Sequence, residues 1–343
     1  MLPPLRFVPL AKARAWGADR LARWNKPNLG GQTIGETWEV ADLPESIPDG
    51  LSVVAEGPFA GRTLRELRMA HRDDLLGEAV PAPDGAFPLL VKYLDAAENL
   101  SLQVHPDERF VARHHDAHLK TEAWIVVACE PGARVYRGIN PATTRAAFED
   151  AIRSGRALDH IEVYEVEPGD CVYLPSGVCH ALGGGILAAE VQTPSDTTFR
   201  VWDWNRNDPK RPLHLEEAFE CLKFGREQFD GVAGFVRSGQ APAVDHGDHL
   251  VRTLCRAAVF TVDAIEVTSP AGTLLPLAPA PTPEVWMVIA GASEWRTTSG
   301  VLHAAAGDTI LRPASVEPGG VQLTAGTKVI RLGCPAQGGP STS

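Results

Sequence analysis

Short apolar runs separated by glycine and proline dominate this chain. Representative runs cover residues 88–94, 124–127 and 186–191. Each is shorter than a typical helix and lies between turn-forming residues, which is typical of β-strands. The 32 glycines and 28 prolines provide the turns between such strands. The pattern predicts a mainly β protein.

Three segments place their apolar residues at helical spacing instead. They comprise Leu64, Leu67 and Leu75 after a possible Thr63 cap, Phe148 and Ile152 after residues 143–144, and Leu215, Ala218, Phe219 and Leu222 before Gly225. A threonine cap and a terminal glycine are common boundaries of helices. We therefore expect a few helices, the last of them ending at Gly225, and we expect them to serve packing.

A Gly-, Pro- and Asp-rich stretch at residues 231–249 predicts a linker between two domains, residues 1–235 and 245–333. The two parts resemble each other. Residues 121–127 are similar to residues 283–289, and Gly169-Asp170 and Gly307-Asp308 each precede a proline at the same distance. A duplicated β-barrel unit explains this repeat, with an extra helix between the two landmarks of the first copy.

The charge balance limits the classes of partner. The formal net charge is -11, and binding to nucleic acid or to an anionic membrane requires a basic surface. No apolar run is long enough for a membrane span or a signal peptide, so we expect a cytoplasmic protein. The six cysteines show no close pairs and are expected to be free thiols.

The strongest motif covers residues 169–180 and has the form G-x5-P-x-G-x2-H, ending at His180. This form is the second of the two sequence motifs of the cupins, a class of jelly-roll barrel. Together with the internal repeat, it predicts two cupin barrels with a few helices.

Four side chains of the first barrel are candidates for a metal site. Gln103 and His105 are two residues apart in an apolar strand, so both face the same side. Glu122 begins the next apolar run, and His180 ends the cupin motif. Their two nitrogen and two oxygen donors suit one zinc ion, or another borderline divalent metal, per chain. The second barrel has Pro318 where His180 would fall, so only the N-terminal barrel is expected to bind metal.

Several ordered segments resemble class I (type I) mannose-6-phosphate isomerase, in its short bacterial form. They are residues 35–40, 99–107, 120–124, 175–180 and 190–204. The resemblance covers roughly residues 1–225. It implies zinc ligation by the four residues named above, and it places the family's conserved arginine at Arg200. It also implies an aldose-ketose interconversion of mannose 6-phosphate and fructose 6-phosphate. Ala18 departs from the family's usual Trp-Gly-Gly.

Isomerisation through a cis-enediol requires a base and stabilisation of a negative oxygen. We expect Lys120 to be the base because it lies two residues from Glu122, on the same face of the strand. Arg200 is expected to stabilise the enediolate, with Glu190 as a second-choice acid or base. The remaining candidates, Lys92 and Ser101, are predicted to contact the phosphate of the hexose substrate. The sequence is compatible with a monomer or a homodimer.

Three other functions fit parts of this pattern. A cupin oxidoreductase with iron or manganese generally has His-x-His where this chain has Gln103-Val104-His105. A sugar-binding cupin without activity would not need the intact ligand set. An isomerase that acts on another phosphorylated sugar is the remaining alternative.

Overall fold

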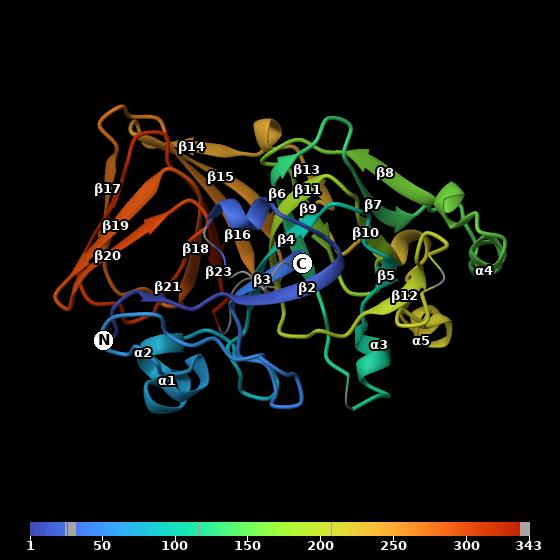
Figure 1. The fold of residues 1–343 in the computed structure, drawn as a ribbon, viewed down its shortest axis with the longest axis horizontal. Helices are drawn as coiled ribbons and strands as arrows, with labels where there is room; N and C mark the ends of the chain where they lie inside the picture. Colours follow the sequence, from blue (N-terminus) through green and yellow to red (C-terminus); the bar gives the residue numbers. More distant parts are fainter. Residues whose placement is uncertain (25, 27–31, 116, 207, 337–343) are drawn as a thin grey trace.

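The computed structural model describes residues 1–24, 26, 32–115, 117–206 and 208–336. The described residues are mainly β, as predicted, and they form four sheets in two pairs. Figure 1 shows the C-terminal pair, in orange and red, at one end of the molecule and the N-terminal pair, largely green, toward the other. Among the described helices, none is long and apolar enough to cross a membrane.

The N-terminal pair combines a seven-stranded sheet with a five-stranded sheet. In sheet order, the larger sheet contains β13 (Phe235–Val236), β9 (Cys171–Leu174), β6 (Glu122–Cys129), β11 (Ile186–Gln192), β4 (Leu90–Ala96), β2 (Leu10–Ala18) and β3 (Ile34–Val40). The smaller sheet contains β12 (Phe199–Trp202), β5 (Leu102–Val104), β10 (His180–Leu182), β7 (Arg134–Ile139) and β8 (Ile161–Glu165). Buried side chains from both sheets, among them Trp124 and Val135, form one apolar core.

The C-terminal pair repeats this plan. Its larger sheet contains β1 (Leu5–Arg6), β21 (Thr309–Arg312), β18 (Glu284–Ala290), β23 (Lys328–Gly333), β16 (Thr261–Val267), β15 (His249–Arg256) and β14 (Ala243–Asp245). Its smaller sheet contains β17 (Thr273–Leu277), β22 (Gly319–Leu323), β19 (Ala292–Thr297) and β20 (Gly300–Ala305). The Trp286 and Trp295 rings, 5.2 Å apart, pack edge to face in the core between these sheets.

The two larger sheets also share a core. Ile125 and Leu187 of the N-terminal half belong to the same buried cluster as Val285 and Met287 of the C-terminal half. Successive strand residues face opposite sides, so β6 and β11 bury one face inside their own sheet pair and the other against the second half. This double burial explains why their sequences are nearly continuous apolar runs.

The two Gly-Asp landmarks, which precede β9 and β21, have the same local structure. Gly169 and Gly307 both have a φ of 95°, in the left-handed region that favours glycine. The following carboxylates, Asp170 and Asp308, each accept a hydrogen bond from the backbone N–H three residues earlier, at 2.9 and 2.8 Å. As predicted, a helix lies between the landmarks of the first copy only, namely α4 (Arg145–Arg153).

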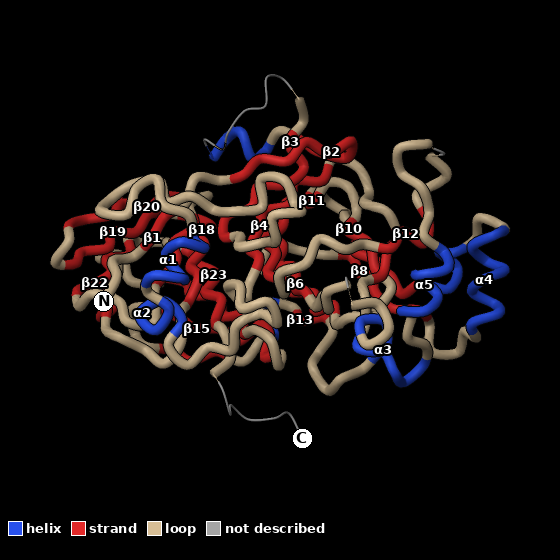
Figure 2. Tube along the Cα trace, turned by 90° about the horizontal axis from the view of Figure 1, so that it is seen from below, coloured by secondary structure: helices blue, strands red, loops and turns tan. Residues whose placement is uncertain are grey.

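The predicted helices are present, with two differences. The first segment forms α1 (Leu64–Ala70), with a Thr63 capping box, and a separate α2 (Arg72–Leu76). The third forms α5 (Leu215–Cys221). Its predicted stop at Gly225 is wrong, because Leu222 already has an extended ψ of 124°. Figure 2 shows α1 and α2 near the N-terminus and α4 and α5 at the opposite end, with α3 (Glu108–Val111) between α5 and the centre.

The predicted linker at residues 231–249 contains regular structure. It includes β13, which pairs with β9 of the N-terminal half, and β14, which pairs with β15 of the C-terminal half. A short 3-10 helix, Ser238–Gln240, lies between them. At the other end of the chain, β1 pairs with β21 of the C-terminal half. The chain therefore connects the two halves at two places.

Candidate active site

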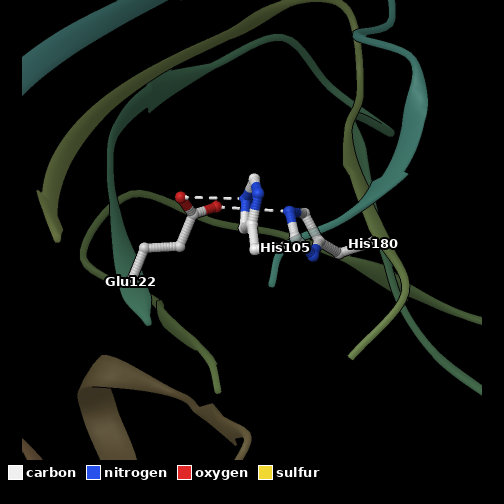
Figure 3. A group of neighbouring side chains, drawn as sticks. All are labelled: His105, Glu122 and His180. Atoms are coloured by element: carbon white, nitrogen blue, oxygen red, sulfur yellow. Dashed lines mark ion pairs between the residues drawn. The ribbon is translucent and has the colours of Figure 1, made fainter. Parts of the chain in front are cut away.

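Three buried side chains meet between the sheets of the N-terminal half. His105 directly follows β5, Glu122 is the first residue of β6, and His180 is the first residue of β10. The Nε2 atoms of His105 and His180 lie 3.3 Å from Glu122 Oε2 and Oε1, respectively. Figure 3 shows both imidazoles directed at the one carboxylate. One candidate ligand atom from each residue lies within 4.8 Å of the others.

Backbone carbonyls orient the two imidazoles. His105 Nδ1 lies 3.1 Å from the Thr197 oxygen, and His180 Nδ1 lies 2.8 Å from the Val178 oxygen. A carbonyl oxygen can only accept a hydrogen bond, so Nδ1 carries the hydrogen and a neutral ring presents the Nε2 lone pair to the site. Histidine metal ligands are commonly oriented by such a hydrogen bond on the other ring nitrogen.

The facing atoms fit a cation between them. Nitrogen lone pairs face carboxylate oxygens, and His105 Nε2 and Glu122 Oε1 are buried without a hydrogen-bond partner. Burial, reinforced by Lys120, lowers the pKa of His105 to about 3, so this ring is neutral near pH 7. Buried acceptors that face each other are costly, and a divalent cation would satisfy all of them.

Gln103 lies beside this group. It pairs with His180 across β5 and β10, and its Nε2 lies 3.3 Å from His180 Nε2. The Ser101 hydroxyl lies 3.4 Å from Gln103 Oε1. Rotating the amide by half a turn exchanges its oxygen and nitrogen, which would present the oxygen to the same point as the other three donors.

A row of paired charges continues across the larger sheet. Lys92 Nζ lies 3.2 Å from Glu190 Oε2 and 3.7 Å from Glu36 Oε2. Glu36 also pairs with Arg14 at 2.7 Å. Burial opposes ionisation of Glu36, but Lys92 and Arg14 lower its pKa to about 2. The nearby Lys120 Nζ lies 3.0 Å from Glu122 Oε2.

Glu190 has a different environment within this row. It accepts a hydrogen bond of 2.9 Å from Trp124 Nε1. Burial raises the pKa of Glu190, and Glu122 adds to this effect while Lys92 opposes it. A buried carboxyl with a raised pKa can serve in acid–base chemistry.

A cavity of about 630 Å³ connects these residues to solvent. Its wall includes six of the nine predicted site residues: Lys92, Ser101, Gln103, Lys120, Glu190 and Arg200. The other three, His105, Glu122 and His180, form the group described above. The volume lies within the range of about 300–1,000 Å³ that is usual for ligand pockets.

The cavity wall also has cations that the sequence analysis did not identify. These are Arg14, Lys210 and Arg211, and they lie with Arg200 on the wall. Arg211 is paired with Asp203 at 2.7 Å. By contrast, neither Arg200 nor Lys210 has a carboxylate within ion-pair distance among the described residues. Burial lowers the pKa of Arg200, and the neighbouring Arg211 adds to this effect while Asp203 opposes it.

The chain is similar to several known proteins. A protein-family model described as "Phosphomannose isomerase type I, catalytic domain" matches residues 5–123 of this chain. The mannose-6-phosphate isomerase ManA of Bacillus subtilis is 39% identical over 224 residues, which are 64% of this chain and 68% of that protein. The mannose-6-phosphate isomerase of Streptococcus mutans is 36% identical over 229 residues, or 66% and 70% of the two chains. A crystal structure of the mannose 6-phosphate isomerase from Bacillus subtilis superposes with a TM-score of 0.81 at 26% identity, covering 96% of this chain and 99% of that one.

We predict that His180→Ala loses bound divalent metal, because it removes one of the donors that face Glu122. Metal per chain, measured by mass spectrometry after gel filtration, should fall at least about tenfold, as expected when a ligand of this kind is lost. The matched control is His303→Ala, since the His303 side chain is 74% exposed. Full metal content in His180→Ala would contradict the ligand assignment.

Proposed function

The chain belongs to the type I phosphomannose (mannose-6-phosphate) isomerase family, and we propose that it interconverts mannose 6-phosphate and fructose 6-phosphate. One observation carries the proposal: a single cavity joins the surroundings of the His105–Glu122–His180 group to the unpaired cations Arg200 and Lys210. An isomerase of phosphorylated hexoses needs both features, because it must polarise a carbonyl group and hold a phosphate group.

The proposed cofactor is one zinc ion per chain, held by Gln103, His105, Glu122 and His180. Imidazole nitrogens and a carboxylate oxygen are usual zinc ligands, and a neutral amide oxygen leaves the ion with more of its positive charge. When bound, a zinc ion supplies Lewis acidity, which polarises a carbonyl oxygen and stabilises negative charge on it.

Lys120 is the proposed carrier of the proton between C1 and C2. Its Nζ lies 3.0 Å from Glu122 Oε2, and the residue is 5% exposed in the wall of the cavity. Acting as the neutral amine, Lys120 would take the aldose C2 proton while the C1–C2 double bond forms and the C1 oxygen takes up a proton, which gives the cis-enediol. Return of the proton from Lys120 to C1, with loss of the proton on the C2 oxygen, then gives the ketose. A single base on one face of the substrate accounts for both transfers.

Glu190 and Lys92 have a supporting role in this proposal. Lys92 is 5% exposed and already lies between two carboxylates, Glu36 and Glu190. These contacts make Lys92 a weaker candidate for the phosphate than the sequence alone suggested. Both side chains can hydrogen-bond the sugar hydroxyls, and Glu190 is the alternative acid or base.

The phosphate site is proposed at Arg200 and Lys210. A guanidinium group forms strong paired hydrogen bonds with phosphate oxygens. Neither cation has a carboxylate within ion-pair distance among the described residues, although Asp196 and Asp208 also line the wall. Ser101, 3% exposed and next to Gln103, lies closer to the metal group. Arg200 pairs with Gln103 across β12 and β5, so its guanidinium could serve both the phosphate and the enediolate.

We further propose that residues 1–235 form the catalytic domain and residues 245–333 a structural cupin-like domain. Glu284 occupies the position of Glu122 in the repeat, opposite Arg312 rather than Leu174. Its carboxylate accepts a 2.9 Å hydrogen bond from Trp286 Nε1, and Arg312 Nη1 lies 3.9 Å away. These contacts stabilise the carboxylate without a metal ion.

Purified protein is expected to convert mannose 6-phosphate to fructose 6-phosphate, and a chelator should abolish the activity until zinc is restored. A coupled assay that reduces NADP as fructose 6-phosphate is consumed measures this directly. A parallel assay supplies glucose 6-phosphate instead of mannose 6-phosphate and measures the release of fructose 6-phosphate. Comparing the two rates tests which sugar phosphate the protein prefers. Absence of turnover in protein shown to contain stoichiometric metal would refute the proposed substrate.

Arg200→Ala should keep its metal and lower kcat/KM by about 10- to 100-fold, the usual effect of losing one or two charged hydrogen bonds. Steady-state kinetics with a parallel metal determination checks this. Arg153→Ala is the control, because the Arg153 side chain is 68% exposed and pairs only with surface carboxylates. An unchanged rate would remove Arg200 from the site.

Lys120→Met should lower kcat by about 10²- to 10⁴-fold, the range for loss of a general base, with a smaller loss for Glu190→Gln. Deuterium incorporation from D₂O into the sugar, followed by NMR, reports the proton transfer itself and should fall in parallel. Metal content is measured for both variants. If Glu190→Gln stops the exchange while Lys120→Met retains it, the base is Glu190.

A further inference from the structure

A second cavity lies at the seam between the two halves, on the opposite side of the larger N-terminal sheet from the active site. Its volume is about 540 Å³, and we call it the seam cavity. The N-terminal half contributes Ile125 of β6, Leu187 of β11 and the 3-10 helix Arg20–Trp24. The C-terminal half contributes residues of β15, β16, β18 and β23. Figure 1 shows β6 and β16 meeting in this region.

The body of the seam cavity is apolar. Its wall includes Trp24, Ile125 and Leu187 from one half and Ile265, Ile289 and Ile330 from the other. Most of these side chains belong to, or pack against, the core that the two halves share. Interfaces between domains are common places for small-molecule sites, and the volume is within their usual range of about 300–1,000 Å³.

The charged residues of the seam cavity are mostly cationic. They are Arg20, Arg23, Arg252, Lys328 and one acid, Glu266. Arg20 is paired with Asp95 at 2.6 Å, and Lys328 with Glu266 at 3.1 Å. Arg23 and Arg252 have neither an ion pair nor a side-chain hydrogen bond among the described residues.

Arg23 is exposed and Arg252 is half-buried, and the cavity wall carries four cations against one acid although the net charge of the chain is -11. Unpaired cations beside an apolar hollow favour a molecule with complementary properties, that is, an apolar body and an anionic head.

We propose that the seam cavity binds a small amphipathic anion, whose apolar body contacts Ile125, Leu187 and Ile330 and whose carboxylate or phosphate group meets Arg23 and Arg252. Such a ligand contacts both halves and therefore stabilises their association. It also lies against strands β6 and β11, whose opposite faces carry Glu122 and Glu190. This site is separate from the proposed isomerase site and does not depend on the activity assigned there.

The test uses the 343-residue protein with three probes of equal chain length. Decanoate and decyl phosphate are kept below their critical micelle concentrations, and decanol is kept below its solubility limit. Isothermal titration measures binding, and thermal unfolding reports stabilisation. We expect one anionic probe or both to bind at one site per chain, at least about tenfold more tightly than decanol, because the head group is charged. Comparing decanoate with decyl phosphate shows which head group fits.

Two variants locate the binding. The double variant Arg23→Gln/Arg252→Gln should weaken the anionic probes about tenfold or more, and Ala264→Phe should block every probe by filling the cavity. Arg153→Gln is the control for charge removal. If Ala264→Phe does not fold, Ala290→Leu narrows the same wall. The proposal is overturned if the cavity-filling variant binds the anionic probes as tightly as the wild-type protein does. It is also overturned if decanol binds the wild-type protein as tightly as both anions, or if none of the three probes binds.

Discussion

The N-terminal half is organised around one electrostatic constraint: the buried Glu122 carboxylate faces two imidazole lone pairs at the inner end of the cavity. Each of these three side chains is about 1% exposed, so solvent cannot satisfy them. Both imidazoles are held by backbone carbonyls on their other nitrogen, and neither ring can turn away without losing that bond. The Lys120 ammonium, 3.0 Å from Glu122 Oε2, offsets part of the carboxylate charge, and a cation between the donors would also satisfy the two imidazole lone pairs.

The surrounding charged residues form a chain of ion pairs across the larger N-terminal sheet. Signs alternate from Arg14 to Glu36, Lys92 and Glu190, so each buried charge has a partner of opposite sign. The network holds charged side chains in a wall that would otherwise exclude them. An acidic protein can still present cations to an anionic substrate, because Arg200 and Lys210 line the same cavity and neither has a carboxylate within ion-pair distance among the described residues.

The two halves show how one strand-and-turn framework can carry different interiors. The glycine turn and its aspartate hydrogen bond are the same in both copies. Where the first copy directs Glu122 toward two histidines, the second directs Glu284 toward Trp286 and Arg312. Packing between the larger sheets ties the second half to the first, so the strands that carry Glu122 and Glu190 are supported on both faces.

The sequence by itself determined the mainly β class and placed Gln103, His105, Glu122 and His180 as candidates for one site, because strand periodicity and motif spacing depend on neighbours along the chain. Arg200 was placed by the family resemblance. It did not determine the helix end at Cys221, the strands within residues 231–249, or the pairing of β1 with β21. It also missed Glu36 as the partner of Lys92, although Glu36 lies in the quoted 35–40 motif, and it missed Lys210 on the cavity wall. Those features were decided by the tertiary structure, because each depends on strand register or loop position between segments far apart in the chain.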